Sequence, residues 1–593
     1  MDPIGIAGLA LAALDQLWKM GERTAVLVSN FREFDNDTKL LEAKIRDENN
    51  RTRALHQLLF EPSNVYAGRT LFVQFDTEVQ KNIHLFFEEA TGILQQAHEL
   101  LSRGQGDPNA CAGGSHPSSD GDAPSMSNGG NSSPRSEMPT TLAPATSPVA
   151  LRHALARPRS FVRLRWSLLD KKRVEAILCQ FSDFNNRIHE NIKLCCLATT
   201  IGVDLAHLRR LEDDVSSRVL GFDTDARLRQ IVAADAGSRD CGPGLASFEI
   251  LGGADGAAEL TLRPSEFVRD DSDGRFGIAI THSRENDNTP GRERRPLLVE
   301  YRSYAPESPV SVDLDDRTKD LVDQLARLLR QPKGVVFRTP RCEGWVRQPE
   351  HNRVAFLFAI PDNVDPMSVS LLKILSSKDV PPPPLGQRFL LAGHLARCIS
   401  QLQLVKWVHK SFRSENILFF PSLDTTASAD REEGPTLPSS CIDISEPWVL
   451  GFEFSRPELY FSHGYGDSCL ARDIYRHPDR QRNPAQLFNK LHDIYALGVV
   501  LLELGLWRPA LDLLGRTVAT GSNAPDPRSV HRHLVRHAER HLASKMGSRY
   551  RDVVLRCLSG DFGVADDTKE DLRLQQAFRA QVVEVLQKAA DTV

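Results

Sequence analysis

The chain has 593 residues, of which 41% are hydrophobic and 25% charged, and its formal net charge is -5 at pH 7. These values are ordinary for a soluble globular protein, and the length requires two or three hydrophobic cores. The slight negative charge argues against nucleic acid as the main partner. Ten cysteines form no CxxC pair and no zinc-type Cys/His cluster, so we expect reduced thiols in an intracellular protein.

The chain opens on MDPIGIAGLALAALDQLWKM, with a short apolar run from Ile4 to Leu14. This run lacks the basic residues that begin a signal peptide and the roughly 20 apolar residues of a spanning helix. We therefore expect a cytoplasmic protein without a transmembrane segment.

Three long stretches near the N-terminus show helical hydrophobic spacing, because their apolar residues recur mainly every three or four positions. Helices of this kind bury their apolar stripes by packing together, so we predict an all-α helical bundle over residues 1–215. The stripes are Phe31, Phe34, Thr38, Leu41 and Ile45; Phe75, Val79, Phe86, Ala90, Ile93, Ala97 and Leu101; and Val174, Ile177, Leu178, Phe181, Phe184, Ile188, Ile192 and Cys195.

Residues 104–150 interrupt this bundle with a segment rich in Gly, Ser, Pro and Asn. Such a segment cannot bury enough apolar surface to offset chain entropy, so we expect it to be disordered. Closure entropy grows slowly with loop length, which makes a long insertion between helices tolerable. Residues 216–246 have a helical pattern and are expected to form a brace or linker.

From about Ser247 the pattern changes to short β-like runs, and after DVPPPPLGQ helices dominate. A strand-rich part followed by a helical part predicts an α+β domain with a small lobe over 247–362 and a large lobe over 363–593. The runs are FEILGG, AELTLR, FGIAITH, PLLVEYRSYA, GVVFR and RVAFLFAI, and one helix from Leu314 to Leu329 interrupts them.

The stretch WVHKSFRSENILFF, Trp407 to Phe420, aligns with the kinase catalytic-loop pattern H-R-D-L-K-P-E-N. The carboxylate of that pattern accepts or orients the proton of the substrate hydroxyl, a role worth ~10²–10⁴ in rate. Ser411 stands in its place, and a serine hydroxyl is a poor substitute near pH 7. The aligned residues are His409, Lys410, Ser411, Phe412, Arg413, Ser414, Glu415 and Asn416, of which His409 is expected to support the loop from the core.

The stretch WVLGFEFSRP aligns with the Asp-Phe-Gly turn of kinases, whose Asp binds the magnesium that bridges the phosphates. Gly451 stands at the Asp position, Phe452 is kept, and Glu453 stands at the Gly position. Glycine has no ligand atom, and Glu453 would reach a cation only from a shifted position. Asn416 alone makes a weak site, so no metal is predicted.

The run LVEYRSYA has the character of the kinase strand that presents a phosphate-binding lysine, with Arg302 at the matching position and Tyr301 as the neighbouring alternative. The following helix offers no Glu to hold that base, and Asp320 and Asp323 are short substitutes. A half-buried strand with an exposed arginine explains the pattern equally well. Weak nucleotide contacts through Arg302 and Asn416 stay open, but no cofactor is predicted.

Two later segments match the architecture of the same fold. YRHPDRQ resembles the end of an activation segment, and LHDIYALGVVLLELG resembles the buried large-lobe helix that begins with Asp493. The glycines of ILGGADGAAEL are better explained by a β-turn than by a phosphate-binding loop.

Taken in order, these segments resemble the protein kinase fold over residues 247–593, and the first half resembles the fungal HeLo (prion-inhibition and propagation) domain. The kinase resemblance implies that Asp493 accepts hydrogen bonds from the catalytic-loop backbone. Because the base, the metal ligand and the Lys–Glu pair are all altered, it also implies a pseudokinase and not an enzyme.

The combination implies a regulatory or signalling protein, in which the kinase-like domain binds protein partners and controls the HeLo bundle in fungal cell death or heterokaryon incompatibility. The HeLo resemblance implies self-association and membrane action on activation, and the basic residues from Arg152 to Arg173 would favour anionic lipid. A solvated basic linker explains these residues too. Two alternatives remain: an active atypical Ser/Thr protein kinase, and a non-catalytic interaction scaffold.

Overall fold

In a computed structural model, the chain divides into two compact units, Met1–His189 and Glu190–Val593. The division falls inside one helix, α5 (Lys171–Leu197), and not at residue 215 as the sequence had suggested. The structure describes residues 3–29, 36–105, 171–237, 260, 266–270, 274–282, 294–303, 316–378, 380–423, 442–452, 456–457, 469–481, 488–514 and 526–593.

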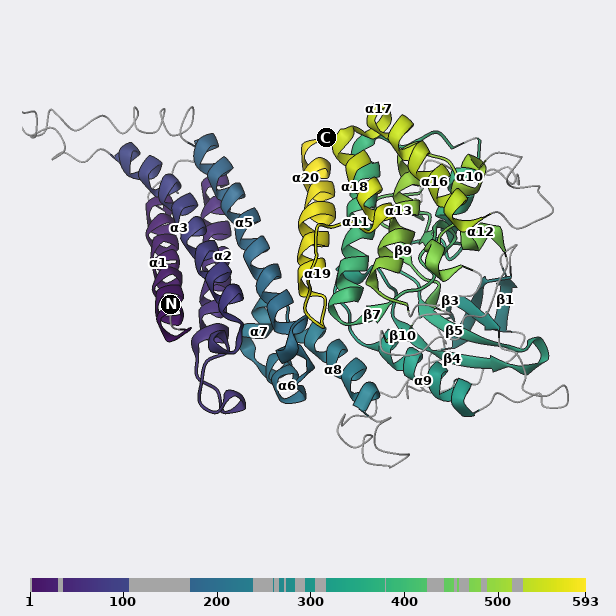
Figure 1. Cartoon of the computed structure of the whole chain (residues 1–593), viewed down its shortest axis with the longest axis horizontal. Helices are drawn as coiled ribbons and strands as arrows, with labels where there is room; N and C mark the ends of the chain where they lie inside the picture. The colour runs from purple at the N-terminus through teal and green to yellow at the C-terminus, as the bar shows by residue number, and fades with distance from the viewer. Residues whose placement is uncertain are drawn as a thin grey trace, which may run out of the picture. The chain divides into compact units, whose positions relative to one another are not determined.

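The first unit is a helical bundle, as the sequence predicted. Within it α1 packs against both α2 and α3 (Figure 1). The start of α5 contacts α3 through the rings of Phe86 and Phe184, whose centroids lie 6.2 Å apart. The helices are α1 (Pro3–Ser29), α2 (Asn36–Phe60), α3 (Thr77–Gln105) and the first turns of α5, with the short 3-10 helices η1 (Asn64–Tyr66) and η2 (Phe72–Gln74) between α2 and α3.

The predicted apolar stripes face the core of this bundle. Thr38, Leu41 and Ile45 of α2 are buried, whereas Phe31 and Phe34 lie outside the described residues. The insertion predicted to be disordered falls outside them from residue 106 on, and so do residues 152–170 of the basic cluster. In the other two stripes Val79, Phe86 and Ile177 are half-buried, and the buried members are Phe75, Ala90, Ile93, Ala97, Leu101, Val174, Leu178, Phe181, Phe184, Ile188, Ile192 and Cys195.

One buried carboxylate joins α2 to α5. The side chain of Glu48 accepts hydrogen bonds from Oγ of Ser182 at 2.6 Å and from Nδ2 of Asn185 at 2.5 Å. Because a buried charge without partners is costly, this pairing restricts how α2 and α5 can pack.

The second unit begins with the end of α5 and three helices that the sequence had assigned to a bundle end and a linker. In α8, Leu228, Ile231 and Val232 belong to the same hydrophobic core as the rest of the unit. Arg229 lies 3.6 Å from the buried carboxylate of Glu570, near the C-terminus. These helices, α6 (Leu205–Asp213), α7 (Val215–Leu220) and α8 (Asp223–Gly237), are therefore part of the second unit.

An antiparallel sheet with the strand order β1-β2-β3-β5-β4 follows. Helix α9 (Asp316–Arg330) connects β3 to β4 and packs against β4, where Nε1 of Trp345 donates a hydrogen bond to Asp323 at 2.8 Å. The strands are β1 (Phe267–Asp270), β2 (Phe276–His282), β3 (Arg294–Ser303), β4 (Cys342–Gln348) and β5 (Arg353–Ala359).

Three of the predicted runs, FGIAITH, PLLVEYRSYA and RVAFLFAI, are strands, and the predicted helix is α9. The run GVVFR was wrongly predicted as a strand, because it forms the 3-10 helix η8 (Val335–Phe337). Val335 is 78% exposed, and Arg338 has a φ of 49°, which is a left-handed conformation. A residue in this conformation cannot continue a β-strand. FEILGG lies outside the described residues, as does AELTLR except for Leu260.

The remainder of the unit is mainly helical, with α11, α13, α18 and α20 side by side (Figure 1). Two small sheets have the orders β10-β7 and β6-β8-β9. The main helices are α10 (Leu371–Ser376), α11 (Leu385–Leu404), α12 (Leu470–Asp473), α13 (Lys490–Leu506), α14 (Ala510–Leu513), α16 (Pro527–His537), α17 (Ala543–Met546), α18 (Ser548–Ser559), α19 (Leu572–Phe578) and α20 (Glu584–Thr592). The short strands are β6 (Val369–Ser370), β7 (Trp407–Val408), β8 (Ile417–Phe419), β9 (Trp448–Val449) and β10 (Arg456–Pro457).

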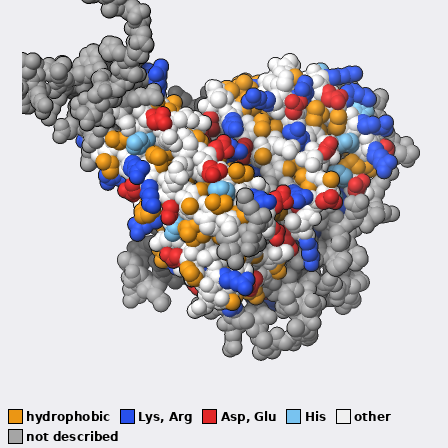
Figure 2. Space-filling view, turned by 60° about the vertical axis from the view of Figure 1, so that its left-hand side comes forward, with side chains coloured by type: hydrophobic (Ala, Val, Ile, Leu, Met, Phe, Trp, Pro, Cys, Tyr) orange, Lys and Arg blue, Asp and Glu red, His pale blue; other side chains and the backbone are white. Residues whose placement is uncertain are grey.

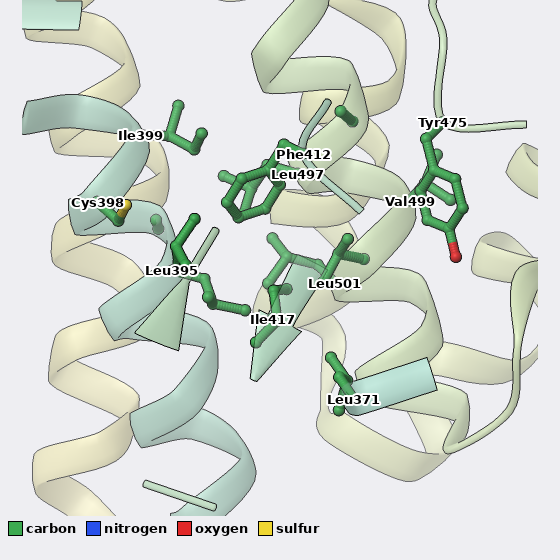
Figure 3. Close-up of a cluster of buried hydrophobic side chains, with 14 of the residues drawn as sticks. Leu371, Leu395, Cys398, Ile399, Phe412, Ile417, Tyr475, Leu497, Val499 and Leu501 are labelled. Carbon is green, nitrogen blue, oxygen red and sulfur yellow. The ribbon is translucent and has the colours of Figure 1, made fainter. Parts of the chain in front are cut away.

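The core of this helical part forms around α11 and α13. Figure 3 shows one buried cluster that includes Leu395 of α11, Phe412 of the loop after β7, Ile417 of β8 and Leu501 of α13. Burying large side chains such as Phe412 stabilises the fold by roughly 1.5–3 kcal/mol each. The loop after β7 is thus anchored by apolar side chains before any polar contact is considered.

None of the described helices is both long enough and apolar enough to cross a membrane. On the face drawn in Figure 2, charged side chains of both signs are interspersed with hydrophobic ones.

Candidate functional site: the loop between β7 and β8

The loop from His409 to Asn416 is held in place by the first turn of α13. Asp493 accepts hydrogen bonds from two consecutive backbone amides, from His409 to Oδ2 at 2.7 Å and from Lys410 to Oδ1 at 2.9 Å. Lys410 has a φ of 64°, a conformation that costs energy for any residue with a side chain. Charge-assisted bonds of this kind can offset that cost, and they are the contact that the kinase resemblance implied for Asp493.

His409 is fully buried, and its ring lies against Phe412 and Phe452 at centroid distances of 5.6 and 5.0 Å. Its Nδ1 accepts a hydrogen bond from the backbone N–H of Ser411 at 3.3 Å. Burial lowers the pKa of His409 to about 3, so the ring is neutral at physiological pH. This neutral, enclosed ring supports the loop and is poorly placed to act as a base.

Ser411 is enclosed by hydrogen-bond donors. Its Oγ accepts a bond from Nη1 of Arg413 at 2.8 Å, and Nδ2 of Asn416 lies 3.3 Å from the same oxygen. Nδ2 of Asn416 also donates to the backbone carbonyl of Ser411 at 2.6 Å. A serine becomes nucleophilic when a neighbouring base accepts its proton, but the groups bonded to this oxygen are donors.

A chain of ion pairs connects this loop to the large sheet. Nε of Arg413 donates to Glu415 at 2.8 Å, and the other carboxylate oxygen of Glu415 lies 2.8 Å from Nη1 of Arg275, the residue before β2. Burial by itself would raise the pKa of Glu415, but the charges of Arg413 and Arg275 outweigh it and lower the pKa, so the carboxylate is ionised. The charges of Arg413 and Glu415 are therefore paired with protein groups.

Gly451 approaches this loop so closely that no side chain fits at its position. It has a φ of 92°, and a β-carbon built on it would lie 2.0 Å from Nδ2 and 2.3 Å from Cγ of Asn416. The N–H of Gly451 donates to the carboxylate of Glu300 on β3 at 3.1 Å. Phe452 is buried next to Trp407, with ring centroids 5.4 Å apart.

The residue of β3 that reaches Gly451 is Glu300, which the sequence analysis missed. Arg302 lies two residues further along the strand and is half-buried, so a role for it in phosphate binding stays a prediction. Asp323 bonds to Trp345 and Asp320 is exposed, while Glu453 lies outside the described residues. The available signal for Glu300 was an acidic residue directly after the apolar run Leu297–Val299 of the predicted strand, where burial demands a partner.

A second buried network holds the end of the loop. The hydroxyl of Tyr475 donates to Oε1 of Glu503 at 2.7 Å and lies 2.8 Å from Oγ of Ser414, and the backbone N–H of Ala510 donates to the same carboxylate at 2.7 Å. Burial raises the pKa of Glu503 to about 7. Tyr475 is the first residue of YRHPDRQ, the segment matched to the end of an activation segment, but the sequence did not indicate Glu503 as its partner.

Among the described residues, no three His, Cys, Asp or Glu side chains are grouped so that they could hold a metal ion. A scan against models of known protein families gives no match, and a search of curated proteins finds none similar to this chain. Inferences about function therefore depend on the geometry described above.

Proposed function

We propose that this protein is a regulatory or signalling protein, in which a kinase-like second unit without phosphoryl-transfer activity controls the N-terminal bundle. The bundle acts on membranes when it is released or assembled, in a pathway of fungal cell death or heterokaryon incompatibility. Protein partners bind to the kinase-like unit and supply the signal.

The kinase-like assignment is supported by the order of the elements. A five-stranded antiparallel sheet with the order β1-β2-β3-β5-β4 carries a helix between its third and fourth strands, and a mainly helical part follows it. The loop from His409 to Asn416 lies between two short strands and is fixed by Asp493 on α13. These are the places at which the kinase resemblance positions its catalytic loop and its large-lobe helix.

The loss of activity is supported above all by the contact between Asn416 and Gly451. In a kinase the position of Gly451 carries the Asp that binds magnesium, and a carboxylate there needs the volume that the Asn416 amide occupies. Ser411, at the position of the catalytic carboxylate, bonds to Arg413 and Asn416. The substitutions at 411 and 451 are thus built into one packed arrangement and are not isolated changes.

The proposal for the bundle is supported by the composition of α1, which is rich in Ala, Gly and Leu. The helix also exposes an aliphatic residue, Leu9, which is 47% accessible. An apolar helix released from a bundle can bury such residues at a lipid interface.

Dye leakage from vesicles containing phosphatidylserine tests this proposal. Residues 1–197, which end with α5, are expected to cause leakage, and the full chain much less. Leu9→Asn should reduce leakage because it removes an exposed apolar residue of α1. Leu40→Asn is the matched control, since Leu40 is 61% exposed on α2.

If residues 1–197 cause no leakage at any protein concentration, including those at which they self-associate, the membrane part of the proposal is wrong. A stable complex between the full chain and a protein partner, without leakage, would favour the interaction scaffold instead.

A further inference from the structure

Three histidines from different elements lie close to Tyr495 in the second unit, with their rings tilted or edge-on to one another. The ring centroid of His477, the residue before η13 (Pro478–Arg480), lies 5.2 Å from that of His492 on α13 and 5.2 Å from that of Tyr495. The ring of Tyr495 lies 5.8 Å from that of His531 on α16. The histidine cluster (His477, His492 and His531) thus joins the segment Cys469–Gln481 to α13 and α16.

Two of these rings accept hydrogen bonds, which requires an unprotonated nitrogen. Nδ1 of His492 accepts from the backbone N–H of Asn489 at 3.0 Å and completes the capping box at the start of α13. Nδ1 of His477 accepts from the backbone N–H of Asp479 at 3.3 Å. Because both nitrogens of a protonated imidazole are donors, protonation removes these bonds.

The charged groups that face the cluster are mainly positive. Lys410 and Arg480 both lie over the ring of Phe488, at 5.3 and 5.9 Å from its centroid, and that ring lies 5.0 Å from the ring of His492. Among the residues that the structure describes, Asp479 is the acidic group beside the cluster, with its carboxylate 3.6 Å from Nδ1 of His477.

We propose that the histidine cluster is an acid-sensitive latch, which holds the segment Cys469–Gln481 against α13 and α16 while its rings are neutral and releases it when the pH falls. Protonating His492 adds a positive charge next to Lys410, Arg480 and His477, and protonating His531 adds one that faces His477. Protonation of His492 also removes the hydrogen bond at the start of α13, and protonation of His477 removes the one at η13. Repulsion and lost bonds thus act in the same direction.

The direction of the pH effect follows from the environment of each ring. Burial lowers the pKa of His477, His492 and His531, that of His492 to about 3. A base with a folded-state pKa below its ordinary value of 6.5 contributes stability that is present above that value and lost as the pH falls. The latch is therefore closed near neutral pH and weakens progressively below about pH 6.5.

Release of this segment also affects the loop between β7 and β8. Tyr475, within the segment, contacts Ser414 and Glu503, and the first turn of α13 carries Asp493, which holds the loop amides. Acidification has the opposite effect at Glu503: because its pKa is raised, a lower pH makes the buried carboxyl neutral and stabilises the fold there. A Glu503→Gln background therefore isolates the contribution of the histidines.

Hydrogen exchange of the full chain, followed by mass spectrometry at about pH 7.5 and about pH 5, tests the latch, after correction for the intrinsic exchange rate. Residues 474–481 should exchange at least about tenfold faster at the lower pH, the factor that a pKa lowered by one unit in a single group gives. Peptides of α18 should not change. In the triple variant H477N/H492N/H531N the increase should be absent, whereas the exposed control His541→Asn should keep it.

The latch does not depend on the proposed function, because the readout needs neither membrane nor partner. Equal corrected exchange of residues 474–481 at both pH values would overturn it. So would an increase that persists in the triple variant, or one that Glu503→Gln abolishes. If the triple variant does not fold, H531N supplies the test: the increase should be smaller than in the natural chain, and an unchanged increase would overturn the latch. Nδ1 of His531 accepts no hydrogen bond from the described residues, so its loss leaves the capping box intact.

Discussion

The side-chain amide of Asn416 occupies the space in which a β-carbon at position 451 would lie, with its Nδ2 only 2.0 Å from that point. The same amide bonds to the carbonyl of Ser411, and the N–H of Gly451 bonds to Glu300. The contact between Asn416 and Gly451 thus links the loop after β7, the turn after β9 and strand β3. A glycine with a φ of 92° is the residue that this approach requires.

Gly451→Ala should destabilise the second unit by about 2 kcal/mol or more, because the backbone strain of a positive φ adds to the clash with Asn416. In an Asn416→Ala background the cost should fall, since the two closest atoms are gone. Urea unfolding followed by tryptophan fluorescence measures both, and the double-mutant cycle gives the coupling between the two positions. A cost that is identical in both backgrounds would show that the two side chains do not compete for space.

Asp493→Ala should cost about 3 kcal/mol, because it removes two charge-assisted hydrogen bonds and leaves the buried amide of His409 and the half-buried amide of Lys410 without that acceptor. Hydrogen exchange at His409 and Lys410 should rise with it. Asp552→Asn is the matched control, since Asp552 is exposed on α18 and pairs with its neighbour Arg551. It should change stability by less than about 0.5 kcal/mol. A loss for Asp493→Ala no larger than that of the control would contradict the role given to Asp493.

Arg229→Met should destabilise the second unit by about 1–2 kcal/mol, because it removes one of two cations beside the buried carboxylate of Glu570, the other being Lys406. Arg227→Met is the matched control on the same helix, as its longer contact with Glu212, 3.8 Å, is partly exposed. Denaturant unfolding of both variants tests whether α8 belongs to the folded core of this unit. Equal stability of the two variants would mean that α8 is only a linker.

The raised pKa of Glu503 should make the stability of the second unit depend on pH. Its pKa, raised to about 7 by burial, exceeds the ordinary value of 4.5, so its contribution is fully present below about pH 4.5 and is lost as the pH rises through about 7. Glu503→Gln keeps an acceptor for Tyr475 and Ala510 but cannot ionise. Between about pH 4.5 and 7, the free energy of unfolding of the Glu503→Gln variant should therefore fall less than that of the natural chain. The difference between the two proteins should grow by up to about 1.4 kcal/mol per pH unit. Parallel curves for the two proteins would rule out the raised pKa.

The position and the supporting residues of the loop between β7 and β8 could be predicted from the sequence, because they follow a recognisable order of residue types. His409, Asn416 and Asp493 stand in a known order beside apolar strands and an apolar helix, and the structure brings them together. The bundle helices were predictable too, since their stripes repeat with the helical period.

What could not be predicted depends on contacts between distant segments. Glu300 lies on β3 and Arg275 directly precedes β2, more than a hundred residues before the loop. No local pattern pairs them with Gly451 and Glu415. Residues 223–237 were taken for a linker because their weak amphipathic pattern does not reveal that Leu228 and Val232 enter a core. Val335 and Val336 resemble a strand by residue type, but both are exposed and the backbone turns.

Transfer of radiolabelled phosphate from ATP with magnesium, by the full chain to itself and to a mixture of peptide substrates, tests the central claim most directly. The claim is that the packed arrangement of Ser411, Asn416 and Gly451 supports no phosphoryl transfer. It predicts that incorporation by the natural chain equals that of Asn416→Ala and of a blank without protein. Incorporation that rises with the amount of natural chain and disappears in Asn416→Ala would contradict it and would make this protein an active kinase.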